Sequence, residues 1–256
     1  KPLNGTNDLA YQRGLLNLTA TMEVAKREYP NPRRVILGGT SGGGYGVLLG
    51  VALARYYYPD KEIVVIADSG APVLTSEDPN FVRSIIEQLG ALHLLPASCP
   101  DCLANGHATG AVEWAMERDG NVRFAYLGHA RDHVIGEYFM GSTAEQFEAS
   151  VVRETGRLVT RFPGRGARFI VPGDRHMLTL DIATVPDGLV HPVLRVFGPA
   201  VFTGPDVTAA ELGTWNLGGL KETGHDAGGT EWTGYRWLTT YLNDPTQLRD
   251  VVELGP

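Results

Sequence analysis

Positive charge, cysteine and long apolar runs are all scarce in this sequence. Its 22 lysines and arginines are outnumbered by 29 aspartates and glutamates, and the formal net charge is −7 over 256 residues. Proteins that bind nucleic acid need a positive surface that displaces counterions, so we expect no nucleic-acid partner. The longest apolar run, Val47–Ala54, ends at Arg55, whereas a membrane-spanning helix needs about 20 apolar residues. We therefore expect no membrane span.

The sequence has two cysteines, Cys99 and Cys102, in the segment CPDC. A pair at this spacing can be a redox motif, half of a zinc site or a local disulfide. Zinc would need two further ligands, and neither a second CxxC nor a suitably spaced histidine pair lies nearby. A thioredoxin-like motif lies at a strand-to-helix turn, whereas this pair lies in a proline-containing loop. A small structural disulfide is the favoured interpretation, and it indicates an oxidising compartment.

Two glycosylation sequons are compatible with that compartment, at Asn4-Gly5-Thr6 and Asn17-Leu18-Thr19. No signal peptide is visible. The expected disulfide favours a secreted or periplasmic protein, and the sequons permit it.

The order of the apolar segments predicts an α/β fold with a mostly parallel sheet. We expect strands at Arg33–Leu37, Lys61–Ala67, Val122–Leu127 and Ala167–Val171, and helices from Asn7 or Asp8 to Glu28 and at Gly43–Tyr57, Phe81–Leu89, Ala111–Glu117, Ala144–Arg161 and Trp232–Leu242. Short, nearly all-apolar strands are typical of parallel sheets with helices on both faces, and their alternation with helices indicates βαβ units. Residues 1–256 show no repeat or linker, so one domain is expected. Its Gly-, Pro- and Asp-rich region 173–230 is interpreted as a cap or rim.

The segment Gly39–Gly43 (GTSGG) matches the G-x-S-x-G pattern of a nucleophile elbow. A strand precedes it and a helix follows it, which is the context that the pattern requires. The glycines allow a turn so sharp that side chains would collide, and the turn projects the hydroxyl of Ser41 above the sheet. The backbone N–H of Gly42 can then donate to an oxyanion, aided by the field of the helix N-terminus.

Two phosphate-binding interpretations of this glycine-rich turn are weaker. A Walker loop requires a Gly-Lys-Ser/Thr that is absent here. A dinucleotide fingerprint has glycine where this sequence has Ser41, and only Asp68 stands near the end of the next strand to bind a ribose.

An acid and a histidine follow the nucleophile in the order Ser, Asp, His that this fold uses. Asp132 follows the strand Val122–Leu127, and His176 follows the strand Ala167–Val171. A carboxylate there can orient an imidazole that accepts the proton of Ser41.

Other residues compete for both roles. Asp68 is the alternative acid, with the bracing of nearby loops as its structural role, and His225 is the alternative base, although no clear strand precedes it. His129 and His133 have the HxxxH spacing of a zinc motif, but Gly128 and the preceding strand predict a loop rather than a helix. We therefore expect neither a metal nor a cofactor.

With these residues in place, the chain resembles the pectin acetylesterase and Notum family of α/β-hydrolases. The matching segments are Val35–Gly46 (VILGGTSGGGYG), Ile66–Gly70 (IADSG) and Phe169–His176 (FIVPGDRH). The similarity spans about Tyr11 to His176, with a weaker match around Trp237. The resemblance implies that Ser41, Asp132 and His176 form a triad that hydrolyses a carboxylic ester, such as an acetyl group on a polysaccharide or glycoconjugate.

Two departures from the family matter. Gly42 stands where the family usually has alanine, which keeps the backbone donor. The family also carries a long upstream segment with the first strands and the other oxyanion donors. We therefore expect those strands to lie on a separate N-terminal segment, and these 256 residues to form only part of the sheet.

Three other functions remain open from the sequence. The same triad can serve a polyester depolymerase, a feruloyl esterase or a lipase. A hydrolase fold can also act as a non-catalytic binding module, because fold does not determine function. A dinucleotide-dependent oxidoreductase is the third.

Overall fold

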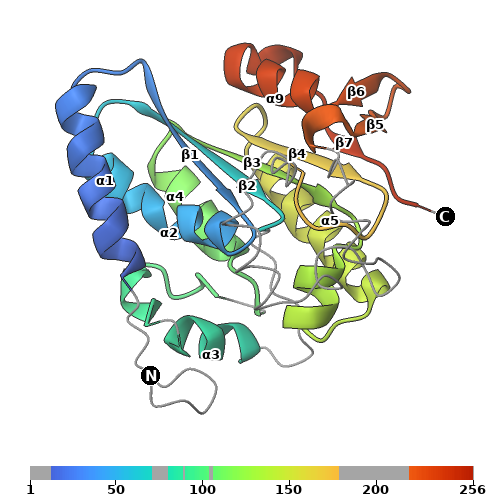
Figure 1. Ribbon diagram of the computed structural model, residues 1–256, viewed down its shortest axis with the longest axis horizontal. Helices are drawn as coiled ribbons and strands as arrows, with labels where there is room; N and C mark the ends of the chain where they lie inside the picture. Colours follow the sequence, from blue (N-terminus) through green and yellow to red (C-terminus); the bar gives the residue numbers. More distant parts are fainter. Residues whose placement is uncertain (1–12, 71–79, 89, 104–105, 179–218, 256) are drawn as a thin grey trace, which may run out of the picture.

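Short runs of β-branched and apolar residues form the central sheet of the computed structural model (Figure 1), which describes residues 13–70, 80–88, 90–103, 106–178 and 219–255. The sheet has the order β1-β2-β3-β4-β7, and all four strand pairs are parallel. Its strands are β1 (Arg34–Thr40), β2 (Glu62–Asp68), β3 (Val122–His129), β4 (Gly166–Val171) and β7 (Val251–Val252). The predicted α/β architecture with a parallel sheet is therefore confirmed.

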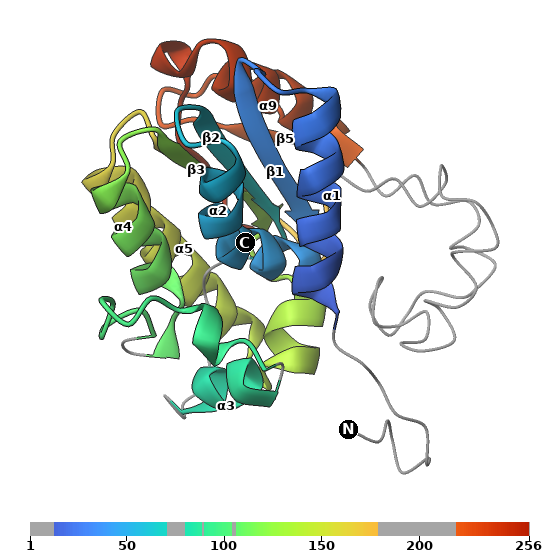
Figure 2. The same ribbon diagram turned by 90° about the vertical axis from the view of Figure 1, so that its left-hand side faces the viewer.

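Helices cover both faces of this sheet (Figures 1 and 2). One face carries α1 (Gly14–Glu28), α2 (Gly42–Tyr57), α4 (Thr109–Arg118) and α5 (Ala144–Arg161). The other face carries α9 (Gly234–Asn243) and the antiparallel pair β5 (Thr223–His225) and β6 (Glu231–Thr233). Each face of the sheet has its own hydrophobic core. Because side chains alternate along a strand, Val65 of β2 packs in the core under α2 and Val64 in the core under α9. Burial on both faces explains why the strands are so apolar.

The remaining elements are short. They are α3 (Phe81–Gln88), the 3-10 turns η1 (Leu92–Leu94), η5 (Gly219–Lys221) and η6 (Pro245–Gln247), and the π-helical segment η3 (Val134–Phe139). Figure 2 shows α3 below the sheet, apart from the strands. None of the helices in the described ranges is long and apolar enough to cross a membrane.

Several predicted boundaries were wrong. β1 does not end at Leu37 but continues through Gly38 and Gly39 to Thr40, because these residues pair with Ile66–Asp68 of β2. β3 includes Gly128 and His129, which were predicted to lie in a loop. β7 was not predicted, since two residues are too few to give a periodic pattern.

Only part of the region 173–230, which was predicted to form a cap or rim, can be compared with the structure. Residues 179–218 lie outside the described residues, as does the predicted helix start at Asn7 or Asp8. Downstream of residue 218 the region contains η5 and β5, so that His225 is the last residue of a strand. The absence of a strand near His225 was therefore a wrong prediction.

Candidate active site

Four side chains with a hydroxyl, carboxyl or imidazole group lie at the ends of parallel strands, and so they lie together at one edge of the sheet. Ser41 follows β1, Asp68 ends β2, Asp132 lies just beyond β3, and His176 lies just beyond β4. The carboxyl ends of parallel strands lie together, and ligands of open α/β sheets bind there. The fold thus gathers residues that are up to 135 positions apart in the sequence, from 41 to 176.

Ser41 occupies a strained turn between β1 and α2. Its backbone angles are φ 54° and ψ −127°, in a region that residues with a side chain rarely adopt. A Cβ atom added to Gly39 would lie 2.2 Å from the carbonyl oxygen of Gly43, and one added to Gly70 would lie 2.7 Å from the carbonyl oxygen of Ser41. The turn therefore requires these glycines, as the G-x-S-x-G pattern predicted for Gly39.

Backbone strain is concentrated at this edge. Within the described ranges, three residues other than glycine have positive φ angles: Ser41, Ser69 and Met177. Ser69 follows Asp68, and Met177 follows His176. Such conformations cost about 1–3 kcal/mol each and cluster at functional sites, so their coincidence here marks the site independently of the sequence motif.

His176 and Asp132 form a buried pair. Nδ1 of His176 lies 2.7 Å from Oδ2 of Asp132, and their side chains are 1% and 0% exposed. The other carboxylate oxygen of Asp132 accepts hydrogen bonds from the backbone N–H groups of Val134 (3.0 Å) and Ile135 (3.1 Å) at the start of η3. These two donors fix the position of the carboxylate, which can then orient the imidazole.

Asp68 contacts the backbone on both sides of the site rather than the ring of His176. Its side chain accepts a hydrogen bond from the N–H of Leu178 (2.9 Å), and its carbonyl oxygen accepts one from the N–H of Ser41 (2.8 Å). Ser69 adds a bond from its hydroxyl oxygen, which accepts from the N–H of Met177 (2.9 Å). Asp68 therefore holds the serine turn and the histidine segment together, the bracing role weighed for it from the sequence.

The other histidines lie in different surroundings. Nδ1 of His225 lies 2.9 Å from Glu253, in an exposed pair on the face that carries α9. Nδ1 of His133 lies 2.8 Å from the carbonyl oxygen of Asp174, whereas His129 is buried at the end of β3. His129 and His133 are thus not on one helix face, as the HxxxH zinc motif requires.

A cavity of about 300 Å³ opens beside Ser41. Its wall is almost wholly apolar and comes from α2, α3, α4, η3 and the segment between α3 and α4. The lining residues are Ser41, Gly42, Tyr45, Leu48, Leu49, Ile85, Ile86, Ala91, Leu95, Leu103, Ala108, Ala111, Ile135, Phe139 and Met140. Small-molecule sites commonly have this size and an apolar wall with few polar groups. The cavity can receive the apolar part of a substrate next to the hydroxyl.

Two tyrosines beside the buried carboxylate stay neutral. Burial raises the pKa of Tyr45 far above its ordinary value of 10.0, and the negative charge of Asp132 adds to the effect. The pKa of Tyr126 is raised well above 10.0 for the same two reasons. Neither phenol therefore competes with His176 as a base, and Tyr45 presents an uncharged surface to the cavity.

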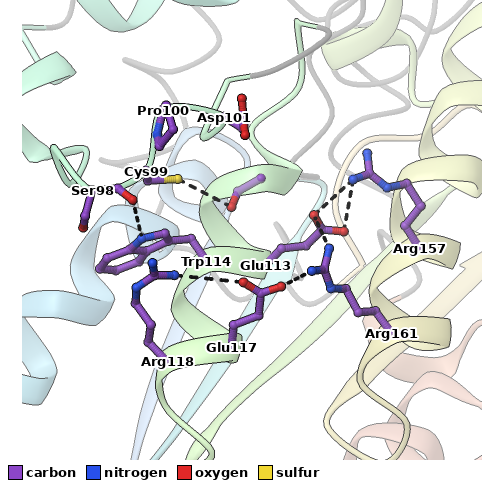
Figure 3. A pocket seen from close by; sticks show the side chains of 11 residues that line it. Ser98, Cys99, Pro100, Asp101, Glu113, Trp114, Glu117, Arg118, Arg157 and Arg161 are labelled. Carbon is purple, nitrogen blue, oxygen red and sulfur yellow. Dashed lines mark hydrogen bonds and ion pairs between the residues drawn. The ribbon is translucent and has the colours of Figure 1, made fainter.

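A second cavity, of about 400 Å³, lies between α4, α5 and the segment Ser98–Asp101 (Figure 3). Charged side chains dominate its wall, and they neutralise one another. Glu113 pairs with Arg157 (3.0 Å) and Arg161 (3.3 Å), and Glu117 also pairs with Arg161. Ser41, Asp132 and His176 do not line it, so this larger cavity is not the candidate active site.

The sulfur atoms of Cys99 and Cys102 beside this second cavity lie at disulfide-bonding distance, as predicted. Elsewhere in the described part of the chain, no group of three or more His, Cys, Asp and Glu side chains is arranged to hold a metal ion.

Sequence reasoning missed several residues of the site. Tyr45 and Ser69 lie in segments that carry the family resemblance, but no role was assigned to either, and the apolar wall residues carry no motif. The spacing of Tyr45 and Leu49 on one helix, four residues apart, places them on the same face. Glu222 contacts His129 from the layer that contains β5 and α9, and no local sequence pattern indicates this contact. Comparison with protein-family models, with curated proteins and with solved structures found no match for this chain.

Proposed function

We propose that this protein is a serine carboxylic-ester hydrolase of the α/β-hydrolase fold. The single observation that carries the proposal is the arrangement at the carboxyl edge of the sheet. A strained serine between a strand and a helix shares that edge with a fully buried Asp132–His176 pair, and Asp68 links the two segments. This combination provides a nucleophile, a base and a group that orients the base.

In the proposed reaction, Nε2 of His176 accepts the proton of Ser41 while Oγ of Ser41 attacks the ester carbonyl carbon. The tetrahedral intermediate collapses, the C–O bond to the alcohol breaks, and His176 returns the proton to the departing oxygen. Water then attacks the acyl-enzyme through the same base, which releases the acid and restores Ser41. Asp132 keeps the proton of the imidazole on Nδ1, so that Nε2 is the basic nitrogen.

The oxyanion of the intermediate is stabilised at the start of α2. Gly42 is the first residue of that helix, and the first N–H groups of a helix have no partner within it. The Gly42 N–H therefore remains available to an oxygen bound beside Ser41. A donor of this kind lowers the barrier by about 3–4 kcal/mol.

The acyl group enters the apolar cavity in this proposal. A volume of about 300 Å³ is about ten times the roughly 30 Å³ that one water molecule occupies in the liquid. The acetyl group that the family resemblance implies therefore occupies only part of the cavity, and larger apolar acyl groups fill it better. A polysaccharide or glycoconjugate as the alcohol, and a secreted or periplasmic location, remain part of the proposal; the disulfide supports the latter.

A fluorophosphonate probe and a series of p-nitrophenyl esters test this function. The intact protein should be labelled at Ser41 and should hydrolyse butyryl and hexanoyl esters with a higher kcat/KM than the acetyl ester. Ser41→Ala should lose labelling and about 10⁶-fold in kcat. Ser98→Ala, which changes a serine at the charged cavity, is the matched control and should behave as wild type.

Two outcomes would contradict the proposal. Full turnover by Ser41→Ala would exclude Ser41 as the nucleophile. An intact protein that neither reacts with the probe nor hydrolyses any ester would instead favour a binding module on the same fold.

A further inference from the structure

A second cluster of charged and titratable side chains, one of them buried and two partly buried, lies immediately behind the candidate active site. Nε2 of His129 lies 3.3 Å from Oε2 of Glu222, and the other oxygen of Glu222 pairs with the guanidinium of Arg175. The side chains of His129 and Glu222 are only 1% and 14% exposed. The mechanism proposed above uses none of these three residues.

The cluster joins three separate parts of the fold. His129 is the last residue of β3, three positions before Asp132, and Arg175 directly precedes His176. Glu222 comes from the opposite layer, one position before β5, and its carbonyl oxygen accepts a hydrogen bond from the N–H of Gly234 at the start of α9 (2.9 Å). Glu222 thus connects the α9 layer to both segments that carry the acid–base pair.

The two segments also contact each other directly. The N–H of Arg131 donates to the carbonyl oxygen of Gly173 (3.0 Å), and the N–H of His133 donates to that of Asp174 (3.0 Å). Gly173 has φ 118°, and a Cβ atom there would lie 3.2 Å from the ring of His129. The ring of His129 therefore packs against the backbone that leads to His176, and a shift of the ring moves that backbone.

Glu222 is ionised in this setting. Burial by itself raises the pKa of a carboxyl group, but the His129 ring and the Arg175 guanidinium outweigh it and hold the pKa of Glu222 below its ordinary value of 4.5. Neither ring nitrogen of His129 has a well-formed hydrogen bond within the described residues, so the carboxylate of Glu222 is the charge that the ring faces. Removal of that charge would leave the buried ring of His129 and the partly exposed guanidinium of Arg175 without this partner.

We infer that Glu222 is a positioning residue for the His176–Asp132 pair, acting through Arg175 and His129. The inference rests on the proposed function, because it assigns a purpose to the precise placement of His176. Glu222 touches neither the substrate nor the reacting atoms. It sets the distance between the imidazole and the serine hydroxyl from outside the site, where misplacement by about 1 Å can reduce the rate by a factor of about 10².

The test compares Glu222→Gln with Glu253→Gln in the full chain. Glu253 is the matched control, because it is also a carboxylate paired with a histidine of the same layer, His225, but it is exposed. The readouts are kcat and KM for a p-nitrophenyl ester, the melting temperature, and the downfield proton resonance of the His176–Asp132 hydrogen bond, assigned by its loss in Asp132→Asn. Glu222→Asp tests rescue of the charge.

We expect Glu222→Gln to reduce kcat by about tenfold to a hundredfold with KM unchanged, and to shift or broaden the downfield resonance. Glu222→Asp should recover part of the rate, and Glu253→Gln should match wild type. Arg175→Gln combined with Glu222→Gln should be no worse than Glu222→Gln alone, because both act through one contact.

An unchanged kcat and resonance in Glu222→Gln would overturn the inference. A loss of activity that merely follows a lower melting temperature, with the resonance intact, would overturn it as well and leave Glu222 a structural residue. A wild-type protein without esterase activity would refute the proposed function. A resonance that still responds to Glu222→Gln would then support the positioning role on its own.

Discussion

Two histidine–carboxylate pairs of this molecule have nearly the same length and very different surroundings. His176 and Asp132 are 2.7 Å apart and 1% and 0% exposed, whereas His225 and Glu253 are 2.9 Å apart and 47% and 38% exposed. The contact between the two groups is therefore not what distinguishes them. The carboxylate of the buried pair accepts two backbone hydrogen bonds, from Val134 and Ile135, and the pair lies at the strained edge of the sheet. The carboxylate of the exposed pair accepts one backbone hydrogen bond, from the N–H of His225 (3.0 Å), and lies in an exposed setting. A histidine is a credible base when its carboxylate is itself held in place.

Among changes to the two pairs and their supports, the largest effect should come from the charge of Asp132. Asp132→Asn keeps the shape but favours the wrong tautomer of His176, and we expect kcat to fall by about 10⁴-fold. Glu253→Gln, the same change in the exposed pair, should leave kcat unaltered. Steady-state hydrolysis of a p-nitrophenyl ester measures both. Equal rates for the two variants would erase the proposed distinction between the pairs.

An intermediate effect is expected at Asp68, which holds the segment behind the buried pair. Asp68→Asn retains one acceptor for the N–H of Leu178 and loses the charge, so the histidine segment is less firmly placed. We expect kcat to fall by about tenfold, far less than in Asp132→Asn. Kinetics of the two variants under identical conditions provide the comparison. A larger loss in Asp68→Asn than in Asp132→Asn would make Asp68 the acid of the triad instead.

The smallest effect concerns stability and pH at the exposed pair. The hydrogen bond to Glu253 raises the pKa of His225 above 6.5, and the hydrogen bond from His225 lowers the pKa of Glu253 below 4.5. A histidine with a raised pKa stabilises the fold below its unfolded pKa and loses that contribution as the pH rises through the folded value. A carboxyl group with a lowered pKa loses its contribution as the pH falls.

The pair of His225 and Glu253 should therefore stabilise the fold slightly where the carboxyl group is ionised and the imidazole is protonated, near pH 5–6. It should not stabilise the fold near pH 9, where the imidazole is neutral. The melting temperature of wild type minus that of Glu253→Gln, measured across this range, should show a small positive difference that disappears at the alkaline end. A difference that grows with pH would contradict this assignment. Activity should not follow the same profile.

The sequence was informative where a pattern extends over many residues or where a motif is rigid. Parallel strands with helices between them could be predicted because each strand is a continuous apolar run. The contact between Asp132 and His176 also follows from their positions after neighbouring strands. The turn at Ser41 could be predicted in part, because any side chain at Gly39 would collide with the backbone of Gly43. The prediction was wrong for Gly43, where there is room for a side chain.

Contacts between distant segments could not be predicted from the sequence. β7 consists of two residues and exists only because β4 offers a free edge for Val251 and Val252. Glu222 lies in no sequence motif, and its partly buried contacts with His129 and Arg175 depend on how distant segments pack. The apolar cavity arises from five elements whose relative placement no local pattern encodes.

The backbone of Ser41 has a consequence for the thermodynamics of the whole chain. A residue with a side chain is held at φ 54° and ψ −127° at a free-energy cost of about 1–3 kcal/mol, and glycine at this position would largely avoid that cost. Ser41→Gly should therefore unfold at a higher urea concentration than wild type while it hydrolyses nothing. If the chain is an esterase, it gives up part of its resistance to unfolding at the one position where the hydroxyl is needed.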